Sequence, residues 1–389
     1  MPTLTAPWIQ RGDLARLVAA LGPGNARYVG GAVRDTLLGL PVKDIDMATL
    51  LRPEAVVERL KAAEIRSVPT GIEHGTVTAV LPGGPVEITT LRHDVATDGR
   101  RATVAFATDW REDAARRDFT INALYADPTD GTLHDWFGGL ADLDARRVRF
   151  IGDARQRIRE DHLRILRYFR FQARFGSTPA DAEAEAACAE LAATLKGLSR
   201  ERVGMEMMNL LGLPDPAPTV ARMVELGVLP VILPEAAPDA LAALVAAERA
   251  QGVAPDPIRR LAALLPPQPP LAEQVASRFR LSAAQKKRLA MAAARGSEQG
   301  EPRALAYRLG REGALDRLLI AGHDVSSLSD WQIPPLPLKG GDVVARGVGA
   351  GPEVARILRR VEDVWIAEGF PEAERVVELL GQVLAERSE

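Results

Sequence analysis

The pattern of apolar and polar positions divides the chain into a mixed first third and a helical remainder. "RYVGGAVRD" (27–35) begins like a strand and continues as a helix through its glycines. "TVTAVLPGGPVEITTLR" (76–92) predicts two strands around a Pro-Gly-Gly turn. From about Gly152 onward, Ala, Leu, Arg and Glu follow the helical period and strand-like runs almost vanish.

Proline clusters interrupt the helical part, which indicates joints between modules. They lie at 213–218, 266–270 and 333–337. The predicted fold class is therefore α+β, with a mixed head to about residue 148 and a helical remainder in two or three pieces.

Composition narrows the class of protein. The chain has 389 residues, of which 47% are hydrophobic and 26% charged, and no apolar run approaches the ~18 residues of a membrane span. The start of the chain lacks the features of a signal peptide, and Cys188 is its single cysteine, so we expect a reducing cytoplasm. The net charge of -3 alone argues against strong electrostatic binding of nucleic acid, but local clusters of charge matter more.

The segment "DIDMAT" (44–49) carries two aspartates one residue apart. In a strand, Asp44 and Asp46 project to one face while Ile45 faces the core. Such close carboxylates raise each other's pKa, and a divalent cation removes that conflict. Mg2+ prefers one or two carboxylates together with phosphate oxygens, so the pair indicates a magnesium site, with an acidic turn as the alternative. Glu87 is a candidate third ligand or an exposed strand residue.

A glycine pair precedes these aspartates. Glycine lets a backbone approach a phosphate closely, and the start of the helix that follows adds partial positive charge. Arg34, in the first turn of that helix, can contact a phosphate with two donors. A glycine turn before a helix is common. Gly30 and Gly31 indicate a phosphate site only because the aspartate pair follows closely in the sequence.

A second basic block, "ARRDFTINALYADP" (115–128), precedes an apolar run that resembles a helix. In one interpretation Asp118 caps this helix. In the other interpretation, Arg117 contacts the phosphate or ribose of a nucleotide, and Asp118 or Asn122 is available to form a hydrogen bond with a ribose hydroxyl.

The segment "GDARQRIREDHLRILRYFRFQARFG" (152–176) predicts one helix. Asp161, Arg164, Arg167 and Arg170 recur every three residues, and each step turns by about -60°, so they fan across the polar side. Its expected buried face consists of Ile158, His162, Ile165, Leu166, Phe169 and Ala173.

These charges form a solvated basic face or a reader of nucleotide bases. Cytosine and adenine each present an amino donor beside a ring acceptor, whereas guanine and uracil present the reverse order. An aspartate that accepts and an arginine that donates therefore select C and A, because a wrong base leaves buried polar groups unpaired.

The motifs together resemble the bacterial class II tRNA nucleotidyltransferases, a family that includes CCA-adding enzymes and poly(A) polymerases. "GGAVRDTLLG…DIDMAT", "RRDFTINALYAD" and "GDARQRIREDHLRILRYFRF" stand in the family's order, and "LPLKGGDVVARGVGAGPEVARILRRVEDVWIAEGF" resembles its tail. The resemblance implies a polymerase-beta-like nucleotidyltransferase head at 1–148, followed by a helical neck at 149–212, a body at 213–332 and an RNA-binding tail at 333–389. The body carries the resemblance least.

Matching positions imply roles for the phosphate site. By resemblance, Asp44 and Asp46 are catalytic and bind magnesium, while Gly31 and Arg34 contact the incoming triphosphate with help from Arg117. The family's reaction is attack by an RNA 3′-hydroxyl on the α-phosphate of CTP or ATP, with release of pyrophosphate.

The resemblance also implies roles for the helix. Asp161 and Arg164 read the base, and Arg167 and Arg170 support the nucleotide. In the CCA-adding members the RNA is tRNA, and we expect neither a membrane nor DNA as a partner.

Three alternatives stay open on the sequence. One is a poly(A) polymerase that acts on other RNAs. Another adds only CC or only A, a difference that would lie near the flexible segment "RHDVATDGRR" (92–101). The third is an inactive RNA-binding scaffold, although both aspartates of the pair are present.

Overall fold

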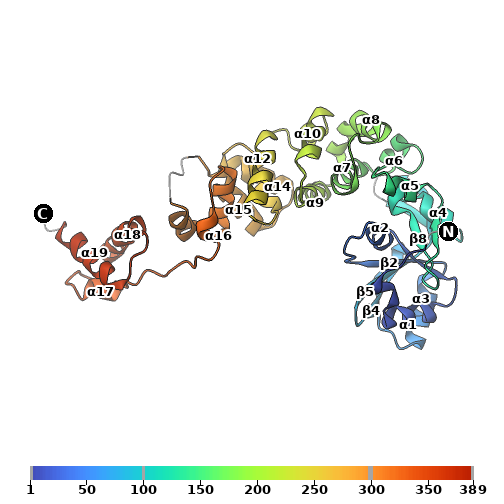
Figure 1. Ribbon diagram of the computed structural model, residues 1–389, viewed down its shortest axis with the longest axis horizontal. Coiled ribbons are helices and arrows are strands. Elements are labelled where there is room, and N and C mark those ends of the chain that lie inside the picture. The colour runs from blue at the N-terminus through green and yellow to red at the C-terminus, as the bar shows by residue number, and fades with distance from the viewer. Residues whose placement is uncertain (1–2, 99–100, 297–300, 387–389) are drawn as a thin grey trace. The chain divides into compact units, whose positions relative to one another are not determined.

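The computed structural model describes residues 3–98, 101–296 and 301–386 (Figure 1). The chain forms two compact units, Met1–Pro234 and Glu235–Glu389. All strands of the described residues lie in the first unit, and the second unit is helical. The α+β class with helices after a mixed sheet is confirmed, while the fourfold division into head, neck, body and tail stays a prediction.

A seven-stranded mixed sheet forms the centre of the first unit. Its order is β3-β4-β5-β2-β1-β8-β9, and among these neighbours only β2 and β5 run parallel. The hairpin predicted around the Pro-Gly-Gly turn is β4–β5, and the predicted passage from strand to helix is β1 followed by α2. The strands are β1 Ala26–Val29, β2 Ile45–Thr49, β3 Ser67–Gly71, β4 Thr76–Leu81, β5 Gly84–Thr90, β8 Leu124–Ala126 and β9 Leu133–Asp135.

Helices surround this sheet and continue beyond it. Those before residue 150 are η1 Pro7–Gln10, α1 Gly12–Leu21, α2 Gly31–Leu37, α3 Pro53–Ala62, η2 Ile72–His74, α4 Trp110–Ala115, η3 Thr120–Asn122 and α5 Gly139–Asp144. Those that follow in the first unit are α6 Ala154–Glu160, α7 Arg164–Phe175, α8 Ala182–Leu191, η4 Ala192–Gly197, α9 Arg200–Leu211, α10 Ala217–Glu225 and α11 Leu229–Ile232.

The alternation of side chains gives the sheet two buried faces. Tyr28 of β1 and Met47 of β2 are register neighbours on one face, where Trp8 packs edge-on against Tyr28. Val29 and Ala48 point to the other face, where they share a hydrophobic cluster with residues of α4. Asp46 lies on this second face, which is called the Asp46 face below.

Strands β6 (Arg92–Asp98) and β7 (Arg101–Phe106) form a separate antiparallel ribbon. The described residues of the segment 92–101, near which the difference between full and partial CCA addition is expected to lie, belong to this ribbon. Residues 99 and 100 of that segment lie outside the described residues. The role of the segment therefore stays a prediction.

The second unit contains two hydrophobic clusters. One includes Leu244, Ala314 and Leu318, and the other centres on Val361 and Trp365. The helices of this unit are α12 Asp239–Ala250, α13 Pro257–Leu264, α14 Pro269–Arg278, α15 Ala283–Ala293, α16 Pro302–Ile320, η5 Ser326–Leu328, α17 Gly340–Val344, α18 Pro352–Ala367 and α19 Ala373–Ala385. Among the described residues, no helix combines the length and apolar character that crossing a membrane requires.

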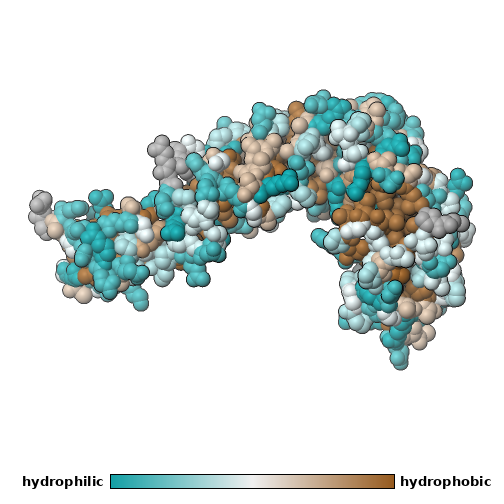
Figure 2. All heavy atoms as spheres, in the orientation of Figure 1, coloured by the Kyte–Doolittle hydropathy of each residue, from teal (hydrophilic) through white to brown (hydrophobic). Residues whose placement is uncertain are grey.

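Apolar residues also gather at the surface between the positions of α2 and α5, as Figure 2 shows. A pocket of about 340 Å³ lies here, lined by Leu37, Leu38, Leu140, Leu143, Asp144 and Arg146. None of these residues is among the predicted site residues, so this pocket is not the predicted nucleotide site.

Candidate active site

The aspartate pair lies at the start of β2, in the middle of the sheet. Asp46 is the register neighbour of Val29 on β1 and of Glu87 on β5, so Asp46 and Glu87 share one face. Asp44 is exposed and immediately precedes the strand. Ile45 is buried, which confirms its prediction as a core residue.

Electrostatics at this position favour a bound cation. Burial, together with the charges of Glu87 and Asp44, raises the pKa of the Asp46 carboxyl to about 6, although the charge of Arg117 acts in the opposite direction. Among the described residues, no hydrogen bond or ion pair satisfies Asp44, Asp46 or Glu87. No described group of three or more His, Cys, Asp or Glu side chains is arranged to hold a metal ion, so Glu87 as a third ligand stays a prediction.

The glycine turn between β1 and α2 has the backbone that its sequence suggested. Gly30 caps α2 with a φ of 68°, a conformation that residues with a Cβ rarely adopt. A Cβ at Gly30 would lie 3.4 Å from Nη1 of Arg117, and one at Gly31 would lie 3.8 Å from Nη2 of Arg34. The turn therefore brings the backbone close to both arginines predicted to contact the triphosphate.

Arg34 is more enclosed than a phosphate ligand alone requires, with a side chain only 7% exposed. Its Nε donates to Oδ1 of Asp35 (2.8 Å), and its Nη1 donates to Oδ1 of Asn122 (2.5 Å). The guanidinium also lies 4.1 Å from the ring centroid of Phe175 and 5.3 Å from that of Phe171, both on α7. Arg34 thus joins α2 to α7, and its unused donors are those left for a phosphate.

The helix expected in 115–128 is wrong. The chain forms the short 3-10 helix η3 and then strand β8, which pairs with β1 and β9. Pairing within the sheet therefore overrides the local helical pattern. Asp118 does not cap a regular helix; its Oδ1 instead accepts hydrogen bonds from Phe119 N and Asn122 Nδ2, both at 2.9 Å.

Arg117 lies beside the Asp46 face. Its Nε donates to the hydroxyl of Tyr125 at 3.0 Å, and its Nη2 lies 3.3 Å from Oδ2 of Asp113. Tyr125 is the register neighbour of Val29, which in turn pairs with Asp46. Because the Arg117 side chain is still 20% exposed, it retains access to a ligand on this face.

The predicted single helix over 152–176 is also wrong. Helix α6 ends at Glu160, Asp161 has extended backbone angles (φ -151°, ψ 105°), and α7 begins at Arg164. The Asp161 carboxylate accepts a hydrogen bond from Leu163 N (3.1 Å), a local bond that competes with a continuous helix.

The expected buried face of this segment is confirmed only in part. Ile158, Ile165, Leu166 and Phe169 are buried. His162 and Ala173 are only partly buried.

Asp161 and Arg164 are held by different partners. Oδ2 of Asp161 accepts a hydrogen bond from Arg202 on α9 (2.7 Å). Arg164 Nη1 donates to Glu160 Oε2 (2.6 Å) and to the carbonyl of Arg157 (2.8 Å). Both side chains are partly exposed, at 28% for Asp161 and 13% for Arg164.

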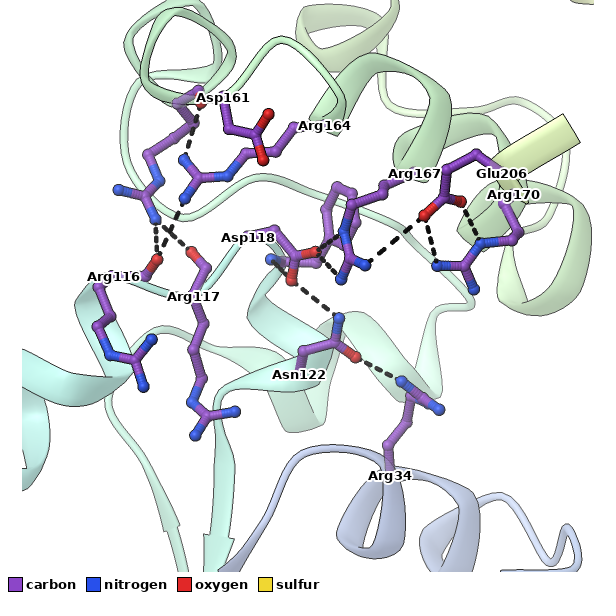
Figure 3. Close-up of polar contacts among 12 residues, drawn as sticks. Arg34, Arg116, Arg117, Asp118, Asn122, Asp161, Arg164, Arg167, Arg170 and Glu206 are labelled. Carbon is purple, nitrogen blue, oxygen red and sulfur yellow. Dashed lines mark hydrogen bonds and ion pairs between the residues drawn. The ribbon is translucent and has the colours of Figure 1, made fainter. Parts of the chain in front are cut away.

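A chain of polar contacts connects Arg34 with the arginines of α7 (Figure 3). Asn122 receives the hydrogen bond from Arg34 and donates to Asp118. Asp118 Oδ2 accepts from Arg167 Nε (2.8 Å) and Nη2 (2.6 Å). Arginine and hydrogen bonds together hold the pKa of Asp118 at about 2 despite its burial.

Glu206 on α9 completes this arrangement. Its Oε2 accepts a hydrogen bond from Arg170 Nε (2.6 Å), its Oε1 lies 3.9 Å from Arg167 Nη1, and its side chain is only 4% exposed. Neither Glu206 nor Arg202 was expected from the sequence as a partner of these residues. Glu206 and Arg202 lie more than 30 residues after Arg170 and Asp161, which they contact. The sequence shows them only as two charged residues of a later predicted helix, which gives no indication of their partners.

The structure therefore brings the predicted residues into one unit. The Asp46 face carries Asp46 and Arg117, and the glycine turn with Gly31 lies beside it. Arg34 connects this turn with α7 through Asn122 and Asp118. This arrangement offers carboxylates for a cation, donors for phosphates and an Asp/Arg pair on a second element.

Comparison with known families identifies the class. Residues 26–149 match the family model described as the poly(A) polymerase head domain. Residues 181–239 match the model described as the probable RNA and SrmB-binding site of polymerase A.

The relatives extend the likeness to most of the chain. It is 36% identical over 363 residues to the mitochondrial CCA tRNA nucleotidyltransferase 1 of Mus musculus, covering 88% of this chain and 83% of the relative. It is 42% identical over 189 residues to the CCA-adding enzyme of Latilactobacillus sakei, covering 48% and 46% of the two chains. The chain therefore belongs to the family of tRNA nucleotidyltransferases and poly(A) polymerases.

Solved structures share the fold. The CCA-adding enzyme of Bacillus stearothermophilus in complex with CTP is similar with a TM-score of 0.71 and 27% identity, covering 99% of this chain and 100% of that one. A structure of a CCA-adding enzyme with ATP gives a TM-score of 0.73 at 22% identity, covering 98% and 96%.

Proposed function

We propose that the protein adds C and A nucleotides to the 3′ end of tRNA from CTP and ATP, without a template. The observation that carries this proposal is the 36% identity to a CCA tRNA nucleotidyltransferase across 88% of the chain. The tRNA 3′ end and the two nucleotides are therefore the proposed partners. The RNA 3′-hydroxyl attacks the α-phosphate, a new phosphodiester bond forms, and pyrophosphate leaves.

Asp44 and Asp46 are the proposed ligands of magnesium. The raised pKa of Asp46 fits a divalent cation, as does the fact that neither carboxylate has a hydrogen-bond or ion-pair partner in the described parts of the chain. When bound, the metal lowers the pKa of the attacking hydroxyl and neutralises charge on the phosphates. The protein's own contribution is to hold two carboxylates at the edge of a rigid central strand.

The remaining site residues bind the nucleotide. Gly31, Arg34 and Arg117 are proposed to contact the triphosphate, since they surround the turn next to Asp46. Within this set, Gly31 and Arg117 are partly exposed, whereas Arg34 is almost fully enclosed.

Asp161 and Arg164 are proposed to read the pairing edge of the base, and Arg167 and Arg170 to support the nucleotide. Asp161 is held by Arg202, and Arg164 is held by Glu160. Each reader therefore presents one hydrogen-bonding function, an acceptor from Asp161 and donors from Arg164.

The test offers purified protein a tRNA transcript that ends before its CCA, with each nucleoside triphosphate singly and all together. Product sizes are measured with magnesium and with EDTA. A product extended by three nucleotides that requires both CTP and ATP supports the proposal. The rate of nucleotide addition should be at least about 10³-fold lower in Asp46→Asn.

Other product patterns decide between the alternatives. Long A-tails would show a poly(A) polymerase, and products that stop after CC or accept only A would show a partial enzyme. No incorporation at all would contradict every enzymatic interpretation. The cytoplasm stays a prediction, since a mitochondrial relative is among the similar proteins.

A further inference from the structure

Arg27 lies on the Asp46 face of the sheet. The charge of Asp127 acts on it, but among the described residues the two side chains form no ion pair. Arg27 occupies β1 two residues before Val29, so both side chains point to the face that carries Asp46. Among the described residues, no oxygen accepts a hydrogen bond from Arg27, and no carboxylate forms an ion pair with it. The donors of Arg34 and Arg117, by contrast, already contact protein groups.

Aromatic rings hold this arginine in place. Its guanidinium carbon lies 4.4 Å from the ring centroid of Trp110, at the start of α4, and 5.9 Å from that of Trp136. Trp136 is itself stacked on His134, with centroids 5.8 Å apart and planes 12° apart. Contacts of a cation with ring faces orient the guanidinium but use none of its five N–H donors.

Partial exposure makes these groups available to a ligand. Arg27, Trp110, His134 and Trp136 are each partly buried rather than enclosed. A planar, oriented guanidinium with free donors suits a phosphate, which it can contact with two hydrogen bonds. Partly exposed tryptophan and histidine rings beside it suit stacking with the bases of a single strand.

The position of Arg27 separates it from the proposed triphosphate site. Arg27 is near the start of β1, whereas Gly31 lies beyond the end of this strand, at the start of α2. The Arg27 side therefore lies along the Asp46 face, away from the turn that is proposed to hold the phosphates of the nucleotide. A second polyanion approaching Asp46 on this face is the RNA strand that supplies the 3′-hydroxyl.

We propose that Arg27, backed by Trp110 and Trp136, binds a backbone phosphate of the RNA strand whose 3′ end is extended. This inference rests on the proposed function and adds a binding site for RNA within the catalytic head. It assigns to the aromatic residues the role of orienting Arg27 and flanking the bound strand.

The test measures binding of a tRNA transcript that lacks CCA, by filter binding between 50 and 200 mM salt, a range of about fourfold. Arg27→Ala should weaken binding about five- to tenfold, and the slope of log Kd against log salt should fall by about 0.7, as expected for one lost contact with a single strand. In Arg27→Gln, which keeps a planar polar group, the slope should fall by the same amount. The KM for CTP should stay unchanged in both variants.

Arg66→Ala is the matched control. Arg66 is exposed, precedes the far edge strand β3, and carries the same charge. We expect its salt slope to equal that of the original protein. Thermal midpoints of all variants separate loss of binding from loss of fold, and Arg27→Gln gives the answer if Arg27→Ala does not fold.

Three outcomes would overturn the inference. One is unchanged RNA affinity and salt slope in Arg27→Gln. Another is an equal fall in slope for Arg66→Ala, which would mean that overall charge alone is responsible. The third is a raised KM for CTP with unchanged RNA binding, which would place Arg27 in the nucleotide site. Failure of the proposed function is distinct, since it would appear as RNA binding by the unaltered protein without nucleotide addition.

Discussion

Two clusters of arginines and carboxylates, one on α7 and one in the second unit, expose their charges differently. In the second unit, Arg259 and Arg260 contact Glu248 at 2.6 and 2.8 Å, and none of the three side chains is more than 5% exposed. On α7, Arg164 and Arg167 also contact carboxylates, yet their side chains are 13% and 33% exposed. The same residue types thus occur once as an interior network and once as an accessible one.

The difference separates stability from binding. A fully buried ion pair has no surface to offer a ligand, and removing one partner leaves an uncompensated charge in the interior. A partly exposed arginine keeps donors that face solvent, so a nucleotide can reach it while its carboxylate partner sets its direction. Exposure, rather than charge, is therefore the property that distinguishes the two clusters.

The largest expected effect breaks the buried cluster. Glu248→Ala should lower the free energy of unfolding by about 3 kcal/mol, because Arg259 and Arg260 lose the carboxylate that they share, although Arg259 keeps its contact with Asp316. Urea unfolding measures this loss. Glu312→Ala is the control, since its side chain is 68% exposed although it contacts Arg288. Equal unfolding midpoints for the two variants would contradict the distinction.

Asp118 is intermediate between the buried and the accessible cluster. Its side chain is only 9% exposed, whereas that of its partner Arg167 is 33% exposed. Its pKa is about 2 in the folded protein and about 3.9 when unfolded, so its charged form stabilises the fold above both values. Asp118→Asn should cost about 2 kcal/mol at pH 7. This difference should shrink as the pH falls from about 5 toward 2.

Urea unfolding of both proteins across this pH range provides the measurement. A difference that stays constant down to pH 3 would show that the Asp118 carboxylate contributes no pH-dependent stability.

A smaller effect concerns selection by the accessible cluster. Arg164→Ala should relax discrimination against UTP and GTP about tenfold, roughly 1.4 kcal/mol, with little change in the unfolding midpoint. Single-nucleotide incorporation with each triphosphate measures the ratio. Arg155→Ala, an arginine of 29% exposure that pairs with Glu183 and Glu190, is the control. If selection persists and only the rate falls, Arg164 does not read the base.

The smallest change in stability is expected for an exposed ion pair that has no proposed role in binding. Arg222 contacts Glu185 and Glu225, but its side chain is 44% exposed. Arg222→Ala should leave the thermal midpoint within experimental error, because solvent screens such pairs. A shift as large as that of Asp118→Asn would mean that exposure does not rank these contacts.

Local patterns in the sequence were sufficient where local chemistry decides the structure. The glycines before Arg34 predicted the passage from β1 to α2, and the alternation around Ile45 predicted that Ile45 belongs to the core. The predicted hairpin at 76–92 followed from a turn between two runs rich in Thr and Val.

Local patterns failed where distant residues decide. Strand β8 replaces the helix expected after Asp118 because β1 and β9 pair with it. The partners Glu206 and Arg202 depend on how α9 packs against α7, which no local spacing encodes. The sequence thus supplied candidate residues for the site, which stay predictions, but not the contacts that orient them.

The interruption at Asp161 gives the two helices independent registers. One extra residue within α6 would leave the phase of α7 unchanged, because the extended backbone at Asp161 separates the two helices, but it would alter how Arg157 and Glu160 meet Arg164. The same insertion between Arg164 and Arg167 would turn every later side chain of α7 by about 100°. The directions of the arginines on α7 therefore depend on their spacing within one helix and not on the length of the helix before it.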